Sequence, residues 1–107
     1  MADIDELSKQ VNDFCDVRDW GQSHNPKDLA IATTLEAAEL LEPFRYQTKE
    51  DVEAIIKDKK GDIEDELADI LFVVFRFSKL YNVDLEAALK RKLKKTGEKY
   101  PLELAKP

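Results

Sequence analysis

The sequence has few residues that favour turns, since its 107 residues include three glycines and four prolines. A β-sandwich or barrel needs a turn every few residues, so this scarcity argues against an all-β fold. A single cysteine excludes a disulfide within the chain and fits a reducing compartment, which predicts a cytoplasmic protein. The acidic N-terminus does not resemble a signal peptide, and the longest apolar stretch, residues 70–75, is too short to cross a membrane.

Positive charge is also in short supply, with 17 basic residues against 23 acidic ones and a net charge of −6. Because an acidic protein repels polyanions, we expect no nucleic-acid partner and no membrane partner. The length is that of one domain, so we treat residues 1–107 as a single domain. A chain this short buries a limited share of its surface, which favours an oligomer.

The spacing of apolar residues predicts an all-α fold, a bundle of four to five helices. Asp3, Asn25 and Asp84 are candidate N-caps, and Pro26 suits the first turn of a helix. Gly61 is expected to end a short helix that begins near Thr48 and Asp51. The expected helices cover about 3–19, 25–42, 48–61, 62–81 and 84 onward, with a loop at 18–25 and a loosely attached tail from 101.

The helix expected at 62–81 is apolar on nearly every side. Such a helix has to be covered on several faces, and one small domain can hardly do this. We therefore predict that part of it contacts another subunit.

Two pairs of acidic residues interrupt apolar segments. Glu36 and Glu39 lie three residues apart, as do Glu66 and Asp69. Residues at this spacing project from the same side of a helix, so each pair offers two carboxylates together. If the two helices pack face to face, four carboxylates converge.

Converging carboxylates repel one another and lose hydration, so either their pKa values rise or cations lie between them. A donor set made only of carboxylates suits Mg²⁺, which commonly binds together with substrate phosphates. The alternative is a solvated helix face with ordinary ion pairs. A di-iron site is disfavoured, because it needs Glu-x-x-His motifs and the one histidine, His24, follows no such Glu.

Taken together, these residues resemble the MazG-like branch of the all-α NTP pyrophosphatases, and within it the dCTP pyrophosphatase group. The resemblance rests on Glu36 and Glu39, a spacer, then Glu66 and Asp69, and on segments 18–24, 25–29 and 99–101. It implies hydrolysis of a (deoxy)nucleoside triphosphate to the monophosphate and pyrophosphate, with dCTP as first guess. It also implies Mg²⁺ as cofactor and a homodimer or homotetramer with sites between subunits.

The resemblance also assigns roles to individual residues. Metal ligands would be Glu36, Glu39, Glu66 and Asp69; substrate-binding residues would be Trp20, His24, Tyr46, Lys92 and Tyr100. We expect Glu39 or Glu36 to accept the proton of the attacking water. Tyr46 stands where many relatives have Trp, and Thr96 where many have Asn.

Other interpretations of the same residues stay open at this stage. Trp20 can close the end of the bundle instead of stacking on a base, and His24 can cap a helix. The substrate can be another nucleotide, such as dUTP or phosphoribosyl-ATP. The chain can also be a non-catalytic helical oligomer that serves as an interaction module.

Overall fold

The computed structural model describes residues 1–23 and 25–105, and every regular element within them is a helix. This confirms the all-α prediction. In chain order the elements are α1 (Ile4–Asp16), the 3₁₀ turn η1 (Trp20–Ser23), α2 (Pro26–Leu41), the 3₁₀ turn η2 (Glu42–Phe44), α3 (Val52–Asp58), α4 (Lys60–Leu80), α5 (Leu85–Lys99) and α6 (Leu102–Ala105). Among the described residues, none of the helices has both the length and the apolar character to cross a membrane.

Three helices begin at the predicted N-caps. The side chains of Asp3, Asn25 and Asp84 each accept a hydrogen bond from the backbone N–H three residues later, at 2.8, 2.8 and 3.0 Å. Pro26 is the first residue of α2, where its missing N–H costs nothing. These local signals fix where α1, α2 and α5 start.

Other boundaries differ from the predictions. Gly61 does not end a helix: it lies in the first turn of α4 and has no positive φ. The break between α3 and α4 falls at Lys59, whose φ of −111° and ψ of 23° are not helical. α1 ends at Asp16, three residues early, and Asp19 then turns the chain with a φ of 59°. The tail, predicted to be loosely attached, includes the one-turn helix α6.

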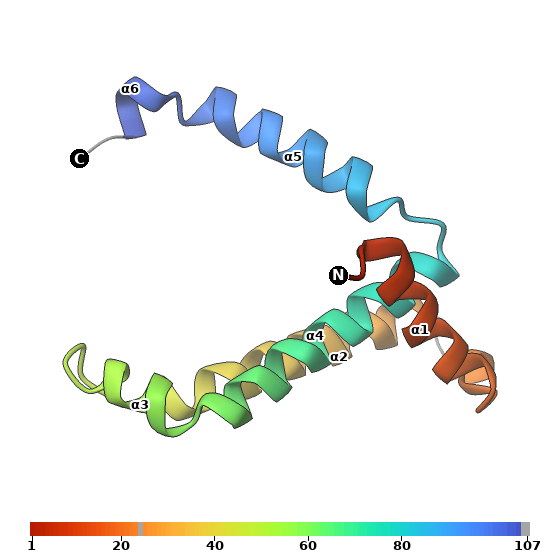
Figure 1. Ribbon diagram of the computed structural model, residues 1–107, viewed down its shortest axis with the longest axis horizontal. Coiled ribbons are helices and arrows are strands. Elements are labelled where there is room, and N and C mark those ends of the chain that lie inside the picture. Colours follow the sequence, from red (N-terminus) through yellow and green to blue (C-terminus); the bar gives the residue numbers. More distant parts are fainter. Residues whose placement is uncertain (24, 106–107) are drawn as a thin grey trace.

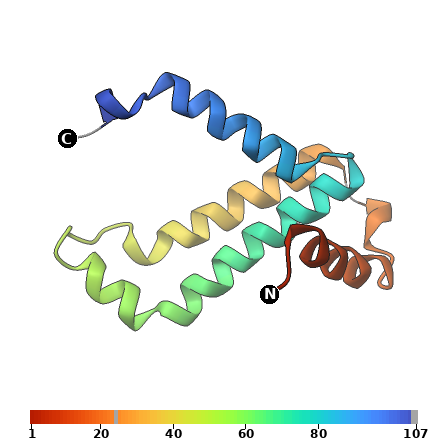
Figure 2. The ribbon, with the colours of Figure 1, turned by 45° about the horizontal axis from the view of Figure 1, so that its top comes forward.

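The centre of the fold is the antiparallel pair of α2 and α4, which lie side by side along most of their length (Figures 1 and 2). α1 packs across the C-terminal half of α4, and α3 packs against its start. Among the residues whose burial the structure describes, the buried apolar ones are Cys15, Leu29 and Phe75. α2 and α1 pack on different sides of α4, and much of its remaining surface is not covered by another helix in the described part of the chain.

α5 departs from this group of helices. It diverges from α2 and α4 toward its C-terminal end, and none of its residues is buried (Figure 1). The radius of gyration is 17.1 Å, against about 13 Å for a compact domain of this length. Leu71, Leu89 and Leu93 are 52%, 55% and 63% exposed. The single chain thus leaves long apolar faces of α4 and α5 in contact with solvent.

Candidate metal centre

The two acidic pairs lie where α2 and α4 pack against each other. Glu36 and Glu39 are on the last turns of α2, and Glu66 and Asp69 are in the first half of α4. The two helices run in opposite directions, so the end of one faces the start of the other (Figure 2). The packing of two separately capped helices therefore brings the pairs together.

Three of the four carboxylates form a close group. Oxygen atoms of Glu36, Glu39 and Glu66 all lie within 4.8 Å of one another. Asp69 is outside that group but near enough to Glu36 for their charges to interact. Both Glu36 and Glu66 are half-buried, whereas Glu39 and Asp69 are exposed. The site is thus closed on the side of the helix pair and open on the other.

Burial and the close approach of the carboxylates raise the pKa values of two of them. Burial, followed by hydrogen bonding with Glu36 and the charge of Glu39, raises the pKa of Glu66 to about 7. Burial is also the main reason that the pKa of Glu36 lies above its usual value, and the charges of Glu39 and Asp69 add to it. Like charges brought together away from water favour protonation. Without a cation, Glu66 therefore keeps its proton to a higher pH than a free carboxylate does.

Two oxygen atoms of the cluster have unmet bonding capacity. Oε2 of Glu36 and Oε2 of Glu66 are both buried and have no hydrogen-bond partner. A buried carboxylate oxygen without a donor is costly, and a metal ion would satisfy both atoms. Since every donor is a carboxylate oxygen, the cluster fits a hard divalent cation. A cavity of about 320 Å³ opens beside it, lined by Glu39 and Glu66 among others.

Sequence reasoning did not single out Lys59, which also lines this cavity. It precedes Glu66 by seven residues, two helical turns, so the spacing alone could have placed both on one side of the chain. The break at Lys59 was predicted two residues later, at Gly61, which hid this relationship. Lys59 is a cation next to the acidic cluster.

None of the predicted substrate-binding residues in the described part of the chain lines the cavity beside the cluster. Trp20 lies in η1, 43% exposed, and Tyr46 follows η2, 80% exposed, with the Arg45 guanidinium 4.8 Å above its ring. Lys92 and Tyr100 are exposed on α5 and at its end, which diverge from α2 and α4 (Figure 1). His24 lies outside the described residues.

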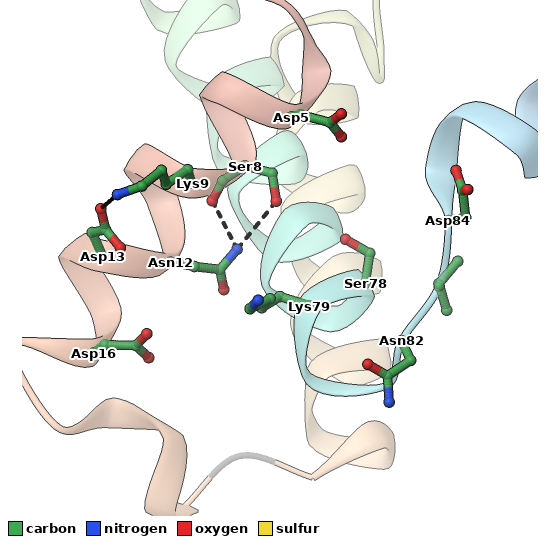
Figure 3. A pocket seen from close by; sticks show the side chains of 11 residues that line it. Asp5, Ser8, Lys9, Asn12, Asp13, Asp16, Ser78, Lys79, Asn82 and Asp84 are labelled. Carbon is green, nitrogen blue, oxygen red and sulfur yellow. Dashed lines mark hydrogen bonds and ion pairs between the residues drawn. The ribbon is translucent and has the colours of Figure 1, made fainter.

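A larger cavity, of about 670 Å³, lies elsewhere, between α1 and the turn that joins α4 to α5 (Figure 3). Its acidic residues Asp5, Asp13, Asp16 and Asp84 are not accompanied by any of the four carboxylates of the cluster. Lys9 is already paired with Asp13. Size alone therefore does not identify the functional site.

The all-α fold and the paired acidic motifs define a class of helical protein with a carboxylate cluster between two antiparallel helices, and comparison with known proteins identifies the family. Residues 31–106 match the MazG-like family, so the chain belongs to that family. It is 27% identical over 105 residues to mouse dCTP pyrophosphatase 1 and 28% identical to the bovine protein. Those matches cover 96% of this chain but 62% of the curated relatives' length.

A solved structure agrees with the family assignment. The crystal structure of a pyrophosphatase from Archaeoglobus fulgidus superposes on this chain with a TM-score of 0.87 and 32% sequence identity. The match covers 94% of both chains. Because the superposition covers nearly all of both chains, the two proteins share the same overall arrangement of helices.

Proposed function

We propose that the chain is a Mg²⁺-dependent nucleoside triphosphate pyrophosphohydrolase, with dCTP as the first substrate to test. The observation that supports this most is the pair of buried, unpartnered oxygens of Glu36 and Glu66 within the carboxylate cluster. The relatives named above, a dCTP pyrophosphatase and a pyrophosphatase, support the reaction class. Removal of surplus or unusual nucleotides from the pool would be its cellular role.

In this proposal Glu36, Glu39, Glu66 and Asp69 hold the cation. Bound Mg²⁺ supplies positive charge that offsets the triphosphate and acidifies nearby water. Glu39 is exposed, so it is placed better than Glu36 to accept a proton from water at the mouth of the site. The water oxygen bonds to the α-phosphorus, the bond from that phosphorus to the bridging oxygen breaks, and pyrophosphate leaves with the bridging oxygen.

In this proposal the substrate contacts are those that the family resemblance assigns, together with Lys59. Trp20 and Tyr46 offer rings for stacking on a base, which is worth roughly 1–3 kcal/mol. Lys92 and Tyr100 would contact phosphates, and Lys59 provides a further cation beside Glu39 and Glu66. His24 belongs to this set by its position in the sequence.

We further propose that the working form is a homodimer or homotetramer. α5 has no buried residue, and the apolar faces of α4 and α5 are open in one chain. A second copy that covers these faces would also bring its own Lys92 and Tyr100 toward the first copy's cluster. The catalytic unit would then need two chains.

The experiment is pyrophosphate release from a panel of ribo- and deoxynucleoside triphosphates, dUTP and phosphoribosyl-ATP included, with Mg²⁺ and then with EDTA. We expect EDTA-sensitive release from one or a few of them. Asp69→Asn should abolish it, whereas Glu64→Gln, an exposed carboxylate of the same helix outside the cluster, should not. No release from any compound, with no effect of Mg²⁺ on stability, would favour the non-catalytic helical oligomer.

A further inference from the structure

Arg76 is a charged residue in the most buried part of the protein. It is 2% exposed and follows Asp69 by seven residues on α4, two turns farther along the helix. A buried guanidinium is costly unless its N–H groups are paired. Its Nη1 donates to Oδ1 of Asn12 at 2.9 Å and to Oδ1 of Asp16 at 3.0 Å. α1 therefore holds the Nη1 end of the guanidinium, whereas Nε is buried without a hydrogen-bond partner.

Asn12 is fixed in turn. It is 3% exposed, and its Nδ2 donates to the backbone oxygen of Ser8 at 2.8 Å and to that of Phe75 at 3.4 Å. Figure 3 shows Asn12 and Asp16 on α1 at the wall of the larger cavity, with Asn12 bonded to Ser8. Asp16 keeps 61% of its side chain exposed, so only the arginine end of that ion pair is buried.

The same guanidinium lies close to Gly21, in the turn that carries Trp20. A Cβ atom added to Gly21 would lie 2.8 Å from Nη2 of Arg76. A flexible side chain could move away from such a contact, but Arg76 is buried and held by two hydrogen bonds. Because glycine has no side chain, Gly21 allows the backbone of η1 to approach the guanidinium of Arg76 closely.

Trp20 has a second connection to α4 through aromatic rings. Its ring meets Phe14 edge-on, with centroids 5.6 Å apart and planes at 72°. Phe14 meets Phe72 of α4 in the same way, at 6.1 Å and 85°. Such contacts are directional, so they favour one orientation of each ring. Phe72 follows Asp69 by three residues, so this connection reaches α4 about one turn beyond Asp69.

We propose that Arg76 is a positioning residue, which fixes the Trp20 turn relative to α4 and hence relative to the carboxylate cluster. It touches neither substrate nor metal. Its effect on catalysis rests on the proposed function, in which Trp20 stacks on the base. Its effect on the placement of Trp20 does not, and can be measured separately.

The placement can be followed by fluorescence, because Trp20 is the only tryptophan in the sequence. Arg76→Lys keeps the charge but loses the planar fork, and Gly21→Ala pushes on the guanidinium from the other side. In both variants we expect a red-shifted emission and stronger quenching by acrylamide. Gly61→Ala is the matched control, since a Cβ there meets no atom within 4 Å. Unchanged emission in both test variants would overturn the proposal.

Steady-state kinetics test the second part of the proposal, the effect of Arg76 on nucleotide binding through Trp20. Complete loss of one base–aromatic stack would raise KM for the nucleotide by roughly 5- to 150-fold, so Gly21→Ala and Arg76→Lys should raise KM by no more than this. Both variants should keep the kcat and the Mg²⁺ dependence of the wild type. Combining Arg76→Lys with Trp20→Ala should raise KM no further than Trp20→Ala alone, because both act through one ring. A fall in kcat at constant KM would contradict this.

Folding is checked by circular dichroism. If Arg76→Lys fails to fold, Asp16→Asn weakens the same network from its exposed end, and the same direction of change is expected. If the wild type hydrolyses nothing, the proposed function fails, while the fluorescence comparison still decides whether Arg76 places Trp20.

Discussion

Glu36 on α2 and Glu66 on α4 each present a buried Oε2 atom without a hydrogen-bond partner, within one close group of carboxylate oxygens. Neither helix alone would create this arrangement. It arises because the two helices pack antiparallel and bury one oxygen of each residue between them. The apo protein thus carries an unfavourable contact that a cation would remove.

Mg²⁺ should therefore stabilise the folded chain. By linkage, a ligand that binds only the folded state at about 100 times its Kd adds about 2.7 kcal/mol. We expect the melting temperature to rise with Mg²⁺ and to rise further with Mg²⁺ and a nonhydrolysable nucleotide. Differential scanning fluorimetry measures this. The same titration on Asp69→Asn should show a reduced shift; an equal shift in both proteins would place the cation elsewhere.

The apo protein should lose stability as pH rises from about 4.5 to about 7. The pKa of Glu66 is raised from 4.5 to about 7, so the folded chain binds a proton that the unfolded chain releases. The resulting stabilisation is complete below pH 4.5 and is lost as pH rises through 7. Glu66→Gln should reduce this slope, leaving the smaller part due to Glu36, as seen in melting temperatures between pH 5 and 8. Saturating Mg²⁺ should reduce it as well.

Removing charge from the cluster should separate stability from activity. Glu39→Gln should abolish turnover while leaving the apo protein as stable as the wild type or more so, because repulsion is relieved. Activity assays and thermal melts on the same preparation measure both. If Glu39→Gln turned over normally, the assignment of this carboxylate would be wrong.

Substitution of Lys92 should lower kcat/KM more than substitution of its lysine neighbours on α5. A hydrogen bond to a charged phosphate is worth about 1.5–3 kcal/mol, so Lys92→Ala should lower kcat/KM by roughly 10- to 150-fold. Lys95→Ala, from the same exposed run, is the matched control and should have little effect. If Lys59→Ala lowered kcat/KM and Lys92→Ala did not, Lys59 would be the phosphate contact, supplied by the same chain as the carboxylate cluster.

The oligomer prediction can be tested on the exposed leucines. Leu71→Glu on α4 and Leu93→Glu on α5 place charges on apolar faces that are open in one chain. We expect light scattering to give a smaller mass for the variants than for the wild type, and pyrophosphate release to fall with it. A monomeric wild type that is fully active would overturn the two-chain site.

Much of the fold could be predicted from local signals. The caps at Asp3, Asn25 and Asp84 act within a few residues of themselves, so the sequence alone contains the information. Gly61 was misjudged because glycine ends a helix only where the chain adopts a left-handed conformation, and here it does not. The prediction that α4 contacts another subunit stays a prediction, supported by its open apolar face.

The site was predictable only in part for a related reason. The three-residue spacing places Glu36 with Glu39, and Glu66 with Asp69, but it says nothing of how two helices pack or which oxygens become buried. Arg76 went unnoticed because it sits in an apolar stretch, where a single charge looks incidental. Its partners Asn12 and Asp16 are 64 and 60 residues away, and no local pattern links them.

The lack of buried residues in α5 also affects how stable this helix is in the single chain. It is a helix of fifteen residues with no buried residue in the chain. Isolated helices of that length are marginal in water, because nucleation is costly and few hydrogen bonds follow. The helix–coil equilibrium of α5 should then depend on protein concentration. Dilution should lower the helicity measured by circular dichroism before any unfolding of α2 and α4, so that α5 would fold as the chains associate.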